Sequence, residues 1–213
     1  MHRIRGLAGQ VRIGTPDASL TPASGVVAVA ELAGRLGVVE AFDDAVGPVK
    51  QRDRGLTAGQ FLVSVAQAQM LGADFWTGLD RRRDDTAGEA LSAVATPAST
   101  TAATLAARFG ASQLAGIEEG IGEICCRVMG LLPARRRAVL RAGTATIDLD
   151  GTDVECYGSR KDGIAYTYKG MRAGRPHVAT WAEAGLVTAA DLLAGDEDQR
   201  PGAAGLKIGR AHV

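Results

Sequence analysis

The spacing of apolar residues predicts a helical region from Gly25 to Arg141. In this region apolar side chains recur at intervals of three and four residues, which is the repeat of an amphipathic helix. Thr57 and Gln60 have the spacing of a capping box, so one helix is expected to begin at Thr57. Residues 87–97 are expected to form a loop. The expected helices span 25–46 with a break at Gly37, 57–72, 74–85, 99–109, 111–132 and 133–143.

A change in the repeat at Thr144 predicts a second, β-rich part of the chain. From there apolar and polar residues alternate with a period of two, which indicates strands. Strands are expected within 144–158 and at 164–170, 178–182 and 186–192, with a turn at 183–185 and a short early strand at 10–13. The sequence therefore predicts an α+β fold. Its expected parts are an N-terminal segment over 1–56, a helical, candidate DNA-binding region over 57–143, and a β region over 144–206.

Two carboxylates stand two residues apart in the first strand of the β region, Asp148 and Asp150 in the run TATIDLDGTDVECYG. Side chains two apart in a strand share a face, roughly 6.6 Å from one another along the chain. Ile147 and Leu149 are then expected to face the core. Two like charges this close need a cation, a proton or a basic neighbour to offset their repulsion. The pattern is thus open to two interpretations, a divalent metal site or the solvated face of an edge strand.

The charge of the chain is balanced overall but clustered locally. Its 213 residues include 24 Lys and Arg and 24 Asp and Glu, so no global field indicates nucleic acid or a membrane. Arg81, Arg82 and Arg83 form one cluster, which we expect on a solvated helix face beside neighbouring aspartates. Contact with DNA phosphates, which suit the planar arginine fork, is the alternative interpretation of this triplet.

Cysteine usage and hydropathy exclude several classes of protein. An odd number of cysteines, with Cys125 and Cys126 adjacent and Cys156 apart, argues against a disulfide framework and a zinc site. The adjacent pair is expected to fill core space. No stretch of about 20 apolar residues could span a membrane, and no apolar segment typical of a signal peptide follows the first arginines. A cytoplasmic protein is expected.

The string IDLDGT resembles the nucleophile motif of haloacid-dehalogenase-type phosphatases. That resemblance implies that Asp148 attacks phosphorus and that Asp150 acts as the acid and base. Such a strand would lead into a doubly wound α/β fold, whereas the residues that follow here read as hairpins. The downstream loop with a lysine and an aspartate is also missing from the pattern, so this interpretation is the weaker one.

A longer resemblance covers roughly residues 56–206. The blocks LTAGQFLVSVAQAQMLGADFWTGLDRRRDDTAG, PASTTAATLAARF, DLDGTDVECYG and AYTYKGMRAGRPHVATWAEAGLVTAADLLAGDEDQRP occur in order. Together they resemble the DDE-class transposases of insertion-sequence family 1380. The resemblance implies DNA transposition by an RNase H-like catalytic domain, of which this chain carries the opening strands. It also implies double-stranded DNA at the terminal inverted repeats as partner, a nucleoid location, and a homodimer of the complete enzyme.

In that family pattern the first catalytic aspartate precedes a short turn with Ser or Thr, so Asp150 before Gly151-Thr152 fits best and Asp148 is the fallback. Phosphodiester cleavage and strand transfer use two metal ions about 3.5–4 Å apart, which activate the attacking oxygen and stabilise the leaving one. Mg²⁺, with Mn²⁺ as a substitute, prefers carboxylate oxygens, water and phosphate. Asp150 is therefore the expected metal ligand.

No role in metal binding is expected for the residues around this strand. Asp153 and Glu155 are expected to be structural because strict alternation places them opposite Asp150, unless Gly151 allows a bulge. Three further residues are expected in a connection between strands: Arg172, Arg175 and His177. They could contact the DNA backbone, or they could only satisfy hydrogen bonds within a turn, and the two interpretations are equally good. Three aromatic residues are expected to pack rather than to stack on bases: Tyr166, Tyr168 and Trp181. Histidine is not expected to be catalytic. Residues 99–109, with Arg108, are compatible with a helix-turn-helix unit.

A complete DDE site needs a second aspartate and a later glutamate, which the resemblance places beyond this chain. Asp191, Asp196 and Asp198 precede the second catalytic position of the family and receive no role. The last seven residues, KIGRAHV at 207–213, match the translation of a common sequencing adapter. The chain is thus expected to be an inactive N-terminal fragment of the transposase, with an open sheet edge that favours aggregation.

Overall fold

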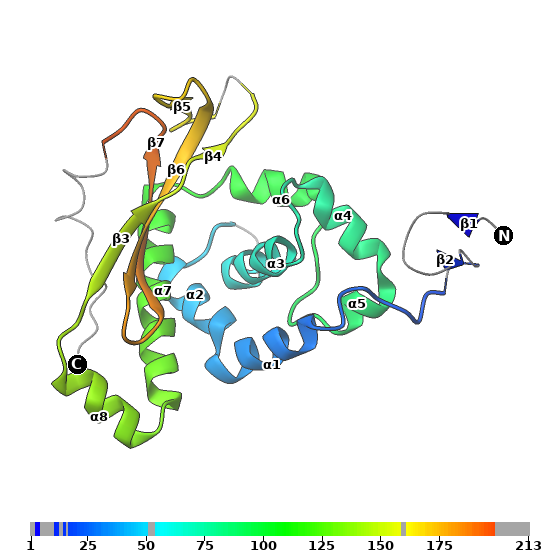
Figure 1. Ribbon diagram of the computed structural model, residues 1–213. Helices are drawn as coiled ribbons and strands as arrows, with labels where there is room; N and C mark the ends of the chain where they lie inside the picture. Colours follow the sequence, from blue (N-terminus) through cyan, green and yellow to red (C-terminus); the bar gives the residue numbers. More distant parts are fainter. Residues whose placement is uncertain are drawn as a thin grey trace.

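The computed structural model describes residues 3–4, 11–12, 15, 17–50, 54–158 and 161–198, so the adapter-like end lies outside the described residues. A group of helices and an antiparallel sheet lie side by side with one long helix between them, which confirms the α+β class (Figure 1). The helices are α1 (Val26–Leu36), α2 (Val38–Val46), α3 (Ala58–Met70), α4 (Thr77–Asp84), α5 (Thr86–Ala90), α6 (Ser99–Ala106), α7 (Ala111–Leu131) and α8 (Ala134–Ala142). The strands are β1 (Arg3–Ile4), β2 (Val11–Arg12), β3 (Ile147–Gly151), β4 (Val154–Glu155), β5 (Ala165–Tyr166), β6 (Arg172–Trp181) and β7 (Leu186–Ala194). Within the described ranges no helix is both long and apolar enough to cross a membrane.

Local signals in the sequence correctly place several helix ends. Gly37, with φ of 57°, separates α1 from α2 as expected. The capping box is confirmed, since Thr57 Oγ1 accepts from the Gln60 N–H and Gln60 Oε1 from the Thr57 N–H, both at 3.1 Å. The expected loop at 87–97 is wrong in its first part, because α5 begins at Thr86. Asp85 starts this helix by accepting the Gly88 N–H at 3.0 Å.

The helical part encloses a core between α3, α4 and α6. Its fully buried members are Phe61, Ala68, Leu79, Ala102 and Leu105. The Phe75 ring is exposed, whereas the Trp76 ring centroid lies 6.3 Å from that of Phe61. No side chain of its own caps the start of α6. Ala98 is the N-cap, and the Ser99 N–H donates to Asp80 Oδ1 of α4 at 2.9 Å.

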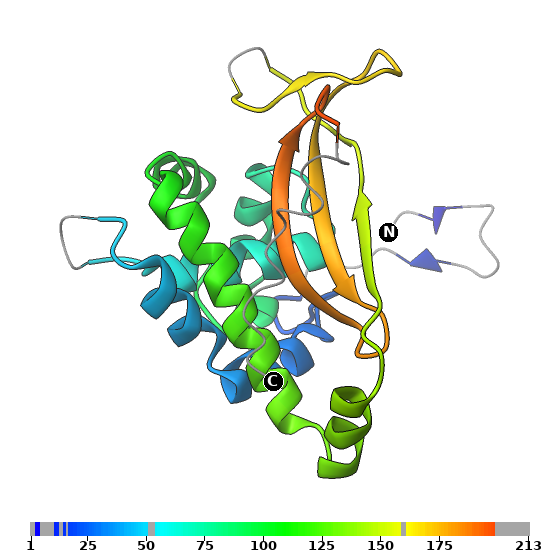
Figure 2. The ribbon, with the colours of Figure 1, turned by 90° about the vertical axis from the view of Figure 1, so that its left-hand side faces the viewer.

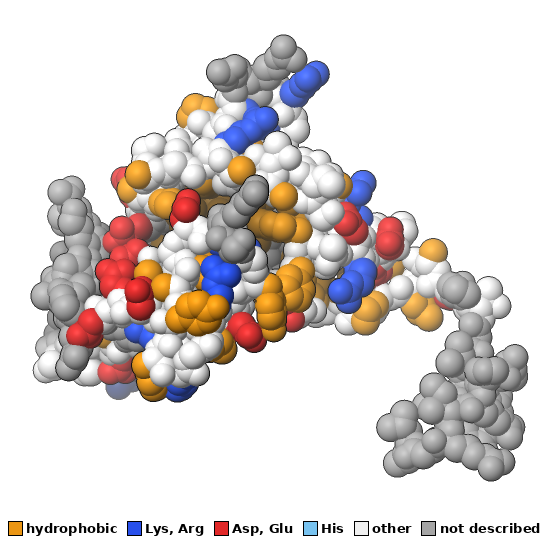
Figure 3. All heavy atoms as spheres, turned by 90° about the horizontal axis from the view of Figure 1, so that it is seen from above, with side chains coloured by type: hydrophobic (Ala, Val, Ile, Leu, Met, Phe, Trp, Pro, Cys, Tyr) orange, Lys and Arg blue, Asp and Glu red, His pale blue; other side chains and the backbone are white. Residues whose placement is uncertain are grey.

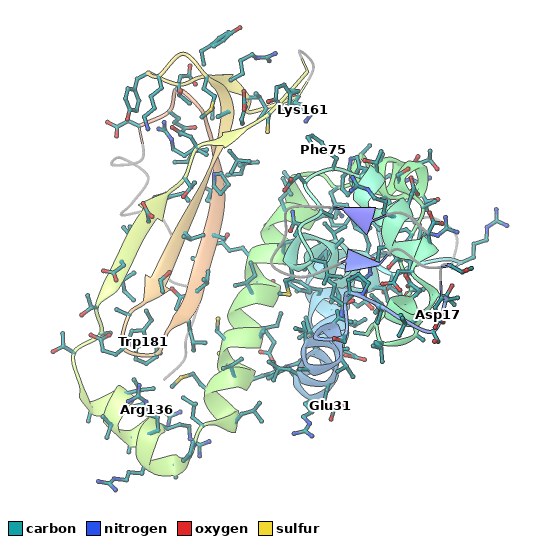
Figure 4. The ribbon with its side chains drawn as sticks, turned by 45° about the vertical axis from the view of Figure 1, so that its right-hand side comes forward. Asp17, Glu31, Phe75, Arg136, Lys161 and Trp181 are labelled. Atoms are coloured by element: carbon teal, nitrogen blue, oxygen red, sulfur yellow. The ribbon has the colours of Figure 1, made fainter. Side chains whose placement is uncertain are left out.

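Helix α7 lies between the other helices and the sheet, and its fully buried positions are glycines rather than leucines (Figure 4). A Cβ built at Gly116 would lie 2.5 Å from the Ala45 carbonyl oxygen, and one at Gly120 would lie 2.6 Å from the Phe42 ring, so α7 and α2 approach closely. The apolar residues near its two ends, Leu114 and Leu131, are exposed.

The cysteines of α7 differ from the expectation of core fillers. Cys126 is exposed, and Cys125 is half-buried where α7 meets β7. The Cys125 thiol donates to the Val187 carbonyl oxygen at 2.7 Å. Its burial, and then the neighbouring Cys126, raise the pKa of the Cys125 thiol above its ordinary value. Cys125 therefore contributes to the contact between helix and sheet rather than to a core.

Strand β6 is the centre of the sheet, and every neighbour pairs with it in the antiparallel sense. β3 and then β4 follow one edge of β6, and β7 and then β5 follow the other. Figure 2 shows β3, β6 and β7 running together beside α7, while the segments around β5 extend beyond the helices. Within the described part of the chain, β3 pairs only with β6, so its outer edge is open as expected.

Strand β6 begins six residues before the expected 178–182 strand, at Arg172. The expectation that Arg172, Arg175 and His177 lie in a connection between strands is therefore wrong. Pro176, which cannot donate to a ladder, is tolerated because it lies opposite the interruption between β3 and β4. There its carbonyl oxygen accepts the Thr152 N–H at 3.1 Å.

The turn at 183–185 is confirmed, and Gly185 adopts a φ of 66° in it. Glu183 links this turn to the start of β3 by accepting the Thr146 hydroxyl at 2.6 Å and the Thr146 N–H at 3.0 Å. The turn also accepts from α8, since Arg136 Nη2 donates to the Glu183 carbonyl oxygen at 2.9 Å (Figure 4). The Thr146 hydroxyl, and then the N–H, lower the pKa of the Glu183 carboxyl from 4.5 to about 2.

This shift predicts an acid-dependent loss of stability. The folded-state pKa of Glu183 lies below its unfolded value. The hydrogen bonds from Thr146 to the Glu183 carboxylate therefore stabilise the fold fully above about pH 4.5, and this stabilisation is lost as the pH falls toward 2. The melting temperature of the Glu183→Gln variant should therefore fall less steeply over this range than that of the parent chain. Thermal unfolding followed by circular dichroism measures this slope. Thr146→Val should flatten it in the same way, and an unchanged slope in both variants would contradict the assignment.

Candidate functional site

The acidic strand β3 exposes both of its aspartates. Asp148 and Asp150 pair with Thr180 and Val178 of β6, so the two carboxylates share one face of the sheet, as alternation predicts. Both side chains are exposed. Leu149, expected to face the core, is 41% exposed, because β3 lies at the edge of the sheet. The strand thus presents two carboxylates to solvent on a rigid backbone.

The surroundings of these carboxylates are sparse. Asp150 Oδ1 accepts the Gly151 N–H at 2.8 Å, and among the described residues neither aspartate forms an ion pair. Their oxygens are the donors that Mg²⁺ prefers. However, the described ranges bring together no group of three or more His, Cys, Asp or Glu that could hold a metal ion. The strand offers the donor type that Mg²⁺ prefers, but it forms no group of metal ligands with the other described residues.

Asp153 and Arg175 form an ion pair across the sheet, with Arg175 Nε 2.8 Å from Asp153 Oδ1 and side-chain exposures of 11% for Arg175 and 16% for Asp153. Arg175 Nη1 also donates to the Glu197 carbonyl oxygen at 2.7 Å. Arg175 is therefore occupied inside the protein rather than free for a DNA backbone. The structural role expected for Asp153 agrees with this pair. Glu155, the other residue expected to be structural, accepts from the Tyr157 hydroxyl at 3.0 Å.

The arginine triplet of α4 does not share one environment. Arg81 and Arg83 are exposed, whereas Arg82 is buried, with 8% of its surface accessible. Arg82 Nη2 donates to Gln67 Oε1 at 3.0 Å and to the Ser92 hydroxyl. The expectation of a solvated triplet is wrong for Arg82, and burial lowers the pKa of its guanidinium from the ordinary value. Arg82 is therefore not placed to contact DNA.

The structure differs from the expectations for Tyr166, Tyr168 and His177. Trp181 packs in the sheet as expected, but Tyr166 and Tyr168 are exposed. His177, with only 1% of its surface accessible, lies between Gly151 of β3 and Asp191 of β7. Among the described residues its Nδ1 has no hydrogen-bond partner. A buried histidine inside a strand is a packing element here, not an open turn residue.

A basic pocket of about 330 Å³ lies beside α6 and is formed in part by residues 99–109, whose sequence is compatible with a helix-turn-helix unit. Lys50, Arg54 and Arg108 line it together with the hydroxyl residues Thr100, Thr101 and Thr104. Lys50 Nζ donates to the Arg54 carbonyl oxygen at 2.6 Å, which holds the first two together. The four-residue spacing of Thr100 and Thr104 places them on one side of α6, and Arg108 follows in the turn after the helix.

Comparison of the chain with protein-family models, with curated proteins and with solved structures finds no match. The fold and the site define an α+β protein with an exposed pair of strand carboxylates and a separate basic pocket.

Proposed function

We propose that this chain is part of a DDE-class transposase, in which Asp150 supplies the first carboxylate of the site that cuts and joins DNA. The observation that carries the proposal is the exposed pair of Asp148 and Asp150 on β3, within the string DLDGT. Asp150 precedes the Gly-Thr turn and is the metal ligand in this proposal. Asp148 is its neighbour and the fallback for the same role.

The arrangement of the sheet supports this proposal over the phosphatase alternative. β3 carries the aspartates and leads into antiparallel partners, β6 and β7. The opening strands of an RNase H-like domain agree with this order, and we propose that fold for the complete domain. A haloacid-dehalogenase-type nucleophile strand is instead expected within a doubly wound, mostly parallel α/β sheet.

Asp150 would hold Mg²⁺ or Mn²⁺ together with carboxylates that are not among the described acidic groups. Such ions stabilise the attacking and leaving oxygens of a phosphodiester. The role of this chain's own strand is to fix the position of Asp150 through its pairing with β6. Since one strand carboxylate pair is too few for two metal ions, this chain alone is expected to be inactive.

Double-stranded DNA would contact the helical part through the basic pocket. Lys50, Arg54 and Arg108 present three cations, and the threonine hydroxyls beside them can donate to phosphate oxygens. Exposed Arg81 and Arg83 on α4 add to the basic surface of the same helical part. Terminal inverted repeats as the preferred sequence, and a homodimer of the complete enzyme, belong to the same proposal.

The salt dependence of duplex binding tests this proposal. For the full chain and a fluorescein-labelled 30-base-pair duplex, fluorescence anisotropy should give an affinity that falls with salt. The double variant Arg54→Gln/Arg108→Gln should lose two phosphate contacts, which lowers the steepness of log K against log salt by about 1.8. Arg35→Gln is the matched control, because Arg35 is exposed but already paired with Glu31 at 2.8 Å. Its slope should stay unchanged.

Other results would favour the alternatives. Absence of duplex binding at low salt would refute the DNA proposal. Duplex binding alone is also the result expected of the alternative, a non-catalytic DNA-binding protein that uses the helical region. With Mg²⁺ or Mn²⁺ the chain should not nick plasmid DNA. Nicking that disappears in Asp150→Asn would show a complete site within this chain. Hydrolysis of a small phosphate ester that depends on Asp148 would favour the phosphatase.

A further inference from the structure

The end of the sheet that carries β4 and β5 exposes every tyrosine of the chain. Tyr157, Tyr166 and Tyr168 are the three tyrosines of the sequence, and they are 64%, 67% and 85% exposed. Aromatic rings dominate cores and interfaces because each buries a large area. A group of exposed rings with no core to cover therefore marks a binding surface. We call Tyr157, Tyr166, Tyr168, Lys169 and Arg172 the aromatic tip.

The backbone of the aromatic tip is held by regular pairing. Glu155 of β4 and Ala165 of β5 pair with the same residue of β6, Ala173, from its two edges. The turn that carries Tyr168 is closed by bonds from the Thr167 N–H to the Met171 carbonyl oxygen at 2.8 Å and from the Gly170 N–H to the Thr167 carbonyl oxygen at 2.9 Å. The rings are thus presented by an ordered frame, which lowers the entropic cost of binding a ligand.

Cations accompany the rings. Lys169 Nζ lies 5.4 Å from the centroid of the Tyr168 ring, and the Arg172 guanidinium lies 5.8 Å from that of Tyr166. A hollow of about 520 Å³ lies beside them, lined by Glu155, Tyr157, Lys169, Met171 and Arg172. Its acidic member, Glu155, accepts from the Tyr157 hydroxyl. Figure 3 views the molecule from this side, and orange and blue side chains lie next to each other near its centre.

We propose that the aromatic tip binds unpaired nucleotides of single-stranded or locally opened DNA. Rings that stand free can stack on the faces of bases, and cations beside them can neutralise the phosphates between those bases. In a duplex the faces of the bases are covered by the neighbouring bases of the stack, so they cannot stack on the tyrosine rings. This inference rests on the proposed DNA substrate and adds a second contact with it, distinct from the basic pocket that would take phosphates of a duplex.

The proposal is tested with the full chain and a fluorescein-labelled oligonucleotide of 16 thymidines, by fluorescence anisotropy at one fixed low salt concentration. Tyr166→Ala and Tyr168→Ala should each lower the affinity by about five- to a hundredfold, the loss of one stacked base. Tyr166→Phe and Tyr168→Phe keep the ring and should bind within about twofold of the parent chain. Leu131→Ala, which truncates a side chain with 59% exposure at the far end of α7, should change nothing.

Separate outcomes decide between this inference and the proposed function. An unchanged affinity in both alanine variants would overturn the aromatic tip as a nucleotide site. If those variants instead change the oligomeric state in size-exclusion chromatography without changing oligonucleotide binding, the tip is a protein interface and the inference is wrong. Duplex binding should be the same in the parent and the tyrosine variants. Loss of duplex binding in the parent, with oligonucleotide binding kept, would overturn the proposed function alone.

Discussion

Gly116→Ala is expected to destabilise the chain by about 1–3 kcal/mol or more, the usual cost of forcing extra atoms into a packed contact. The added Cβ would lie 2.5 Å from the Ala45 carbonyl oxygen and 2.7 Å from the Val46 Cα. Both are backbone atoms of the end of α2, so no side-chain rotation can relieve the contact. The two helices would have to separate, and the other contacts between α2 and α7 would be lost with them.

Gly130→Ala is the matched control in the same helix. No heavy atom lies within 4 Å of a Cβ built at Gly130, so only the helix propensity changes. Alanine is favoured over glycine by about 1 kcal/mol inside a helix, and Gly130→Ala should be neutral or stabilising. Urea unfolding followed by circular dichroism gives both free energies of unfolding. Equal values for the two variants would show that α7 and α2 do not approach closely at Gly116.

The helix boundaries were predictable where a local signal exists. The capping box at Thr57 and the break at Gly37 are read directly from the sequence, because each satisfies backbone groups within a few residues. The packing of α7 was not predictable from apolar periodicity. The period of its leucines and isoleucines indicates a face, but the closest contact is made at Gly116 and Gly120, where the absence of a side chain matters.

The candidate site likewise has features that could be predicted from the sequence and features that could not. Strand alternation correctly predicts that Asp148 and Asp150 share a face, because that depends only on a period of two. The partner of Arg175 could not be predicted, since Asp153 comes beside it only through the pairing of β4 with β6. Tyr166 and Tyr168 were expected to pack because AYTYKG alternates like a strand. The strand stops after two residues, however, and a turn carries Tyr168 outward.

Asp153→Ala is expected to lower the free energy of unfolding by about 3 kcal/mol, the lower end of the range for breaking a buried ion pair. The Nε of Arg175 lies 2.8 Å from the carboxylate, and both side chains are more than four-fifths buried. Removal of Asp153 leaves a buried guanidinium with only the Glu197 carbonyl oxygen, at 2.7 Å, as its recorded acceptor. Asp162→Ala, which removes an exposed acidic side chain from the turn between β4 and β5, should change the free energy by less than about 0.5 kcal/mol.

The double variant Asp153→Leu/Arg175→Met separates the charge effect from packing. Replacing both partners of a buried pair by apolar residues of similar volume is often neutral or stabilising, so this variant should be more stable than Asp153→Ala. Urea unfolding of the double variant and of the two single variants Asp153→Leu and Arg175→Met gives the coupling energy of the pair. A coupling energy near zero would contradict the ion pair. If Arg175→Met weakened duplex binding without loss of stability, Arg175 would contact DNA after all, and its pairing with Asp153 would not be what holds it in β6.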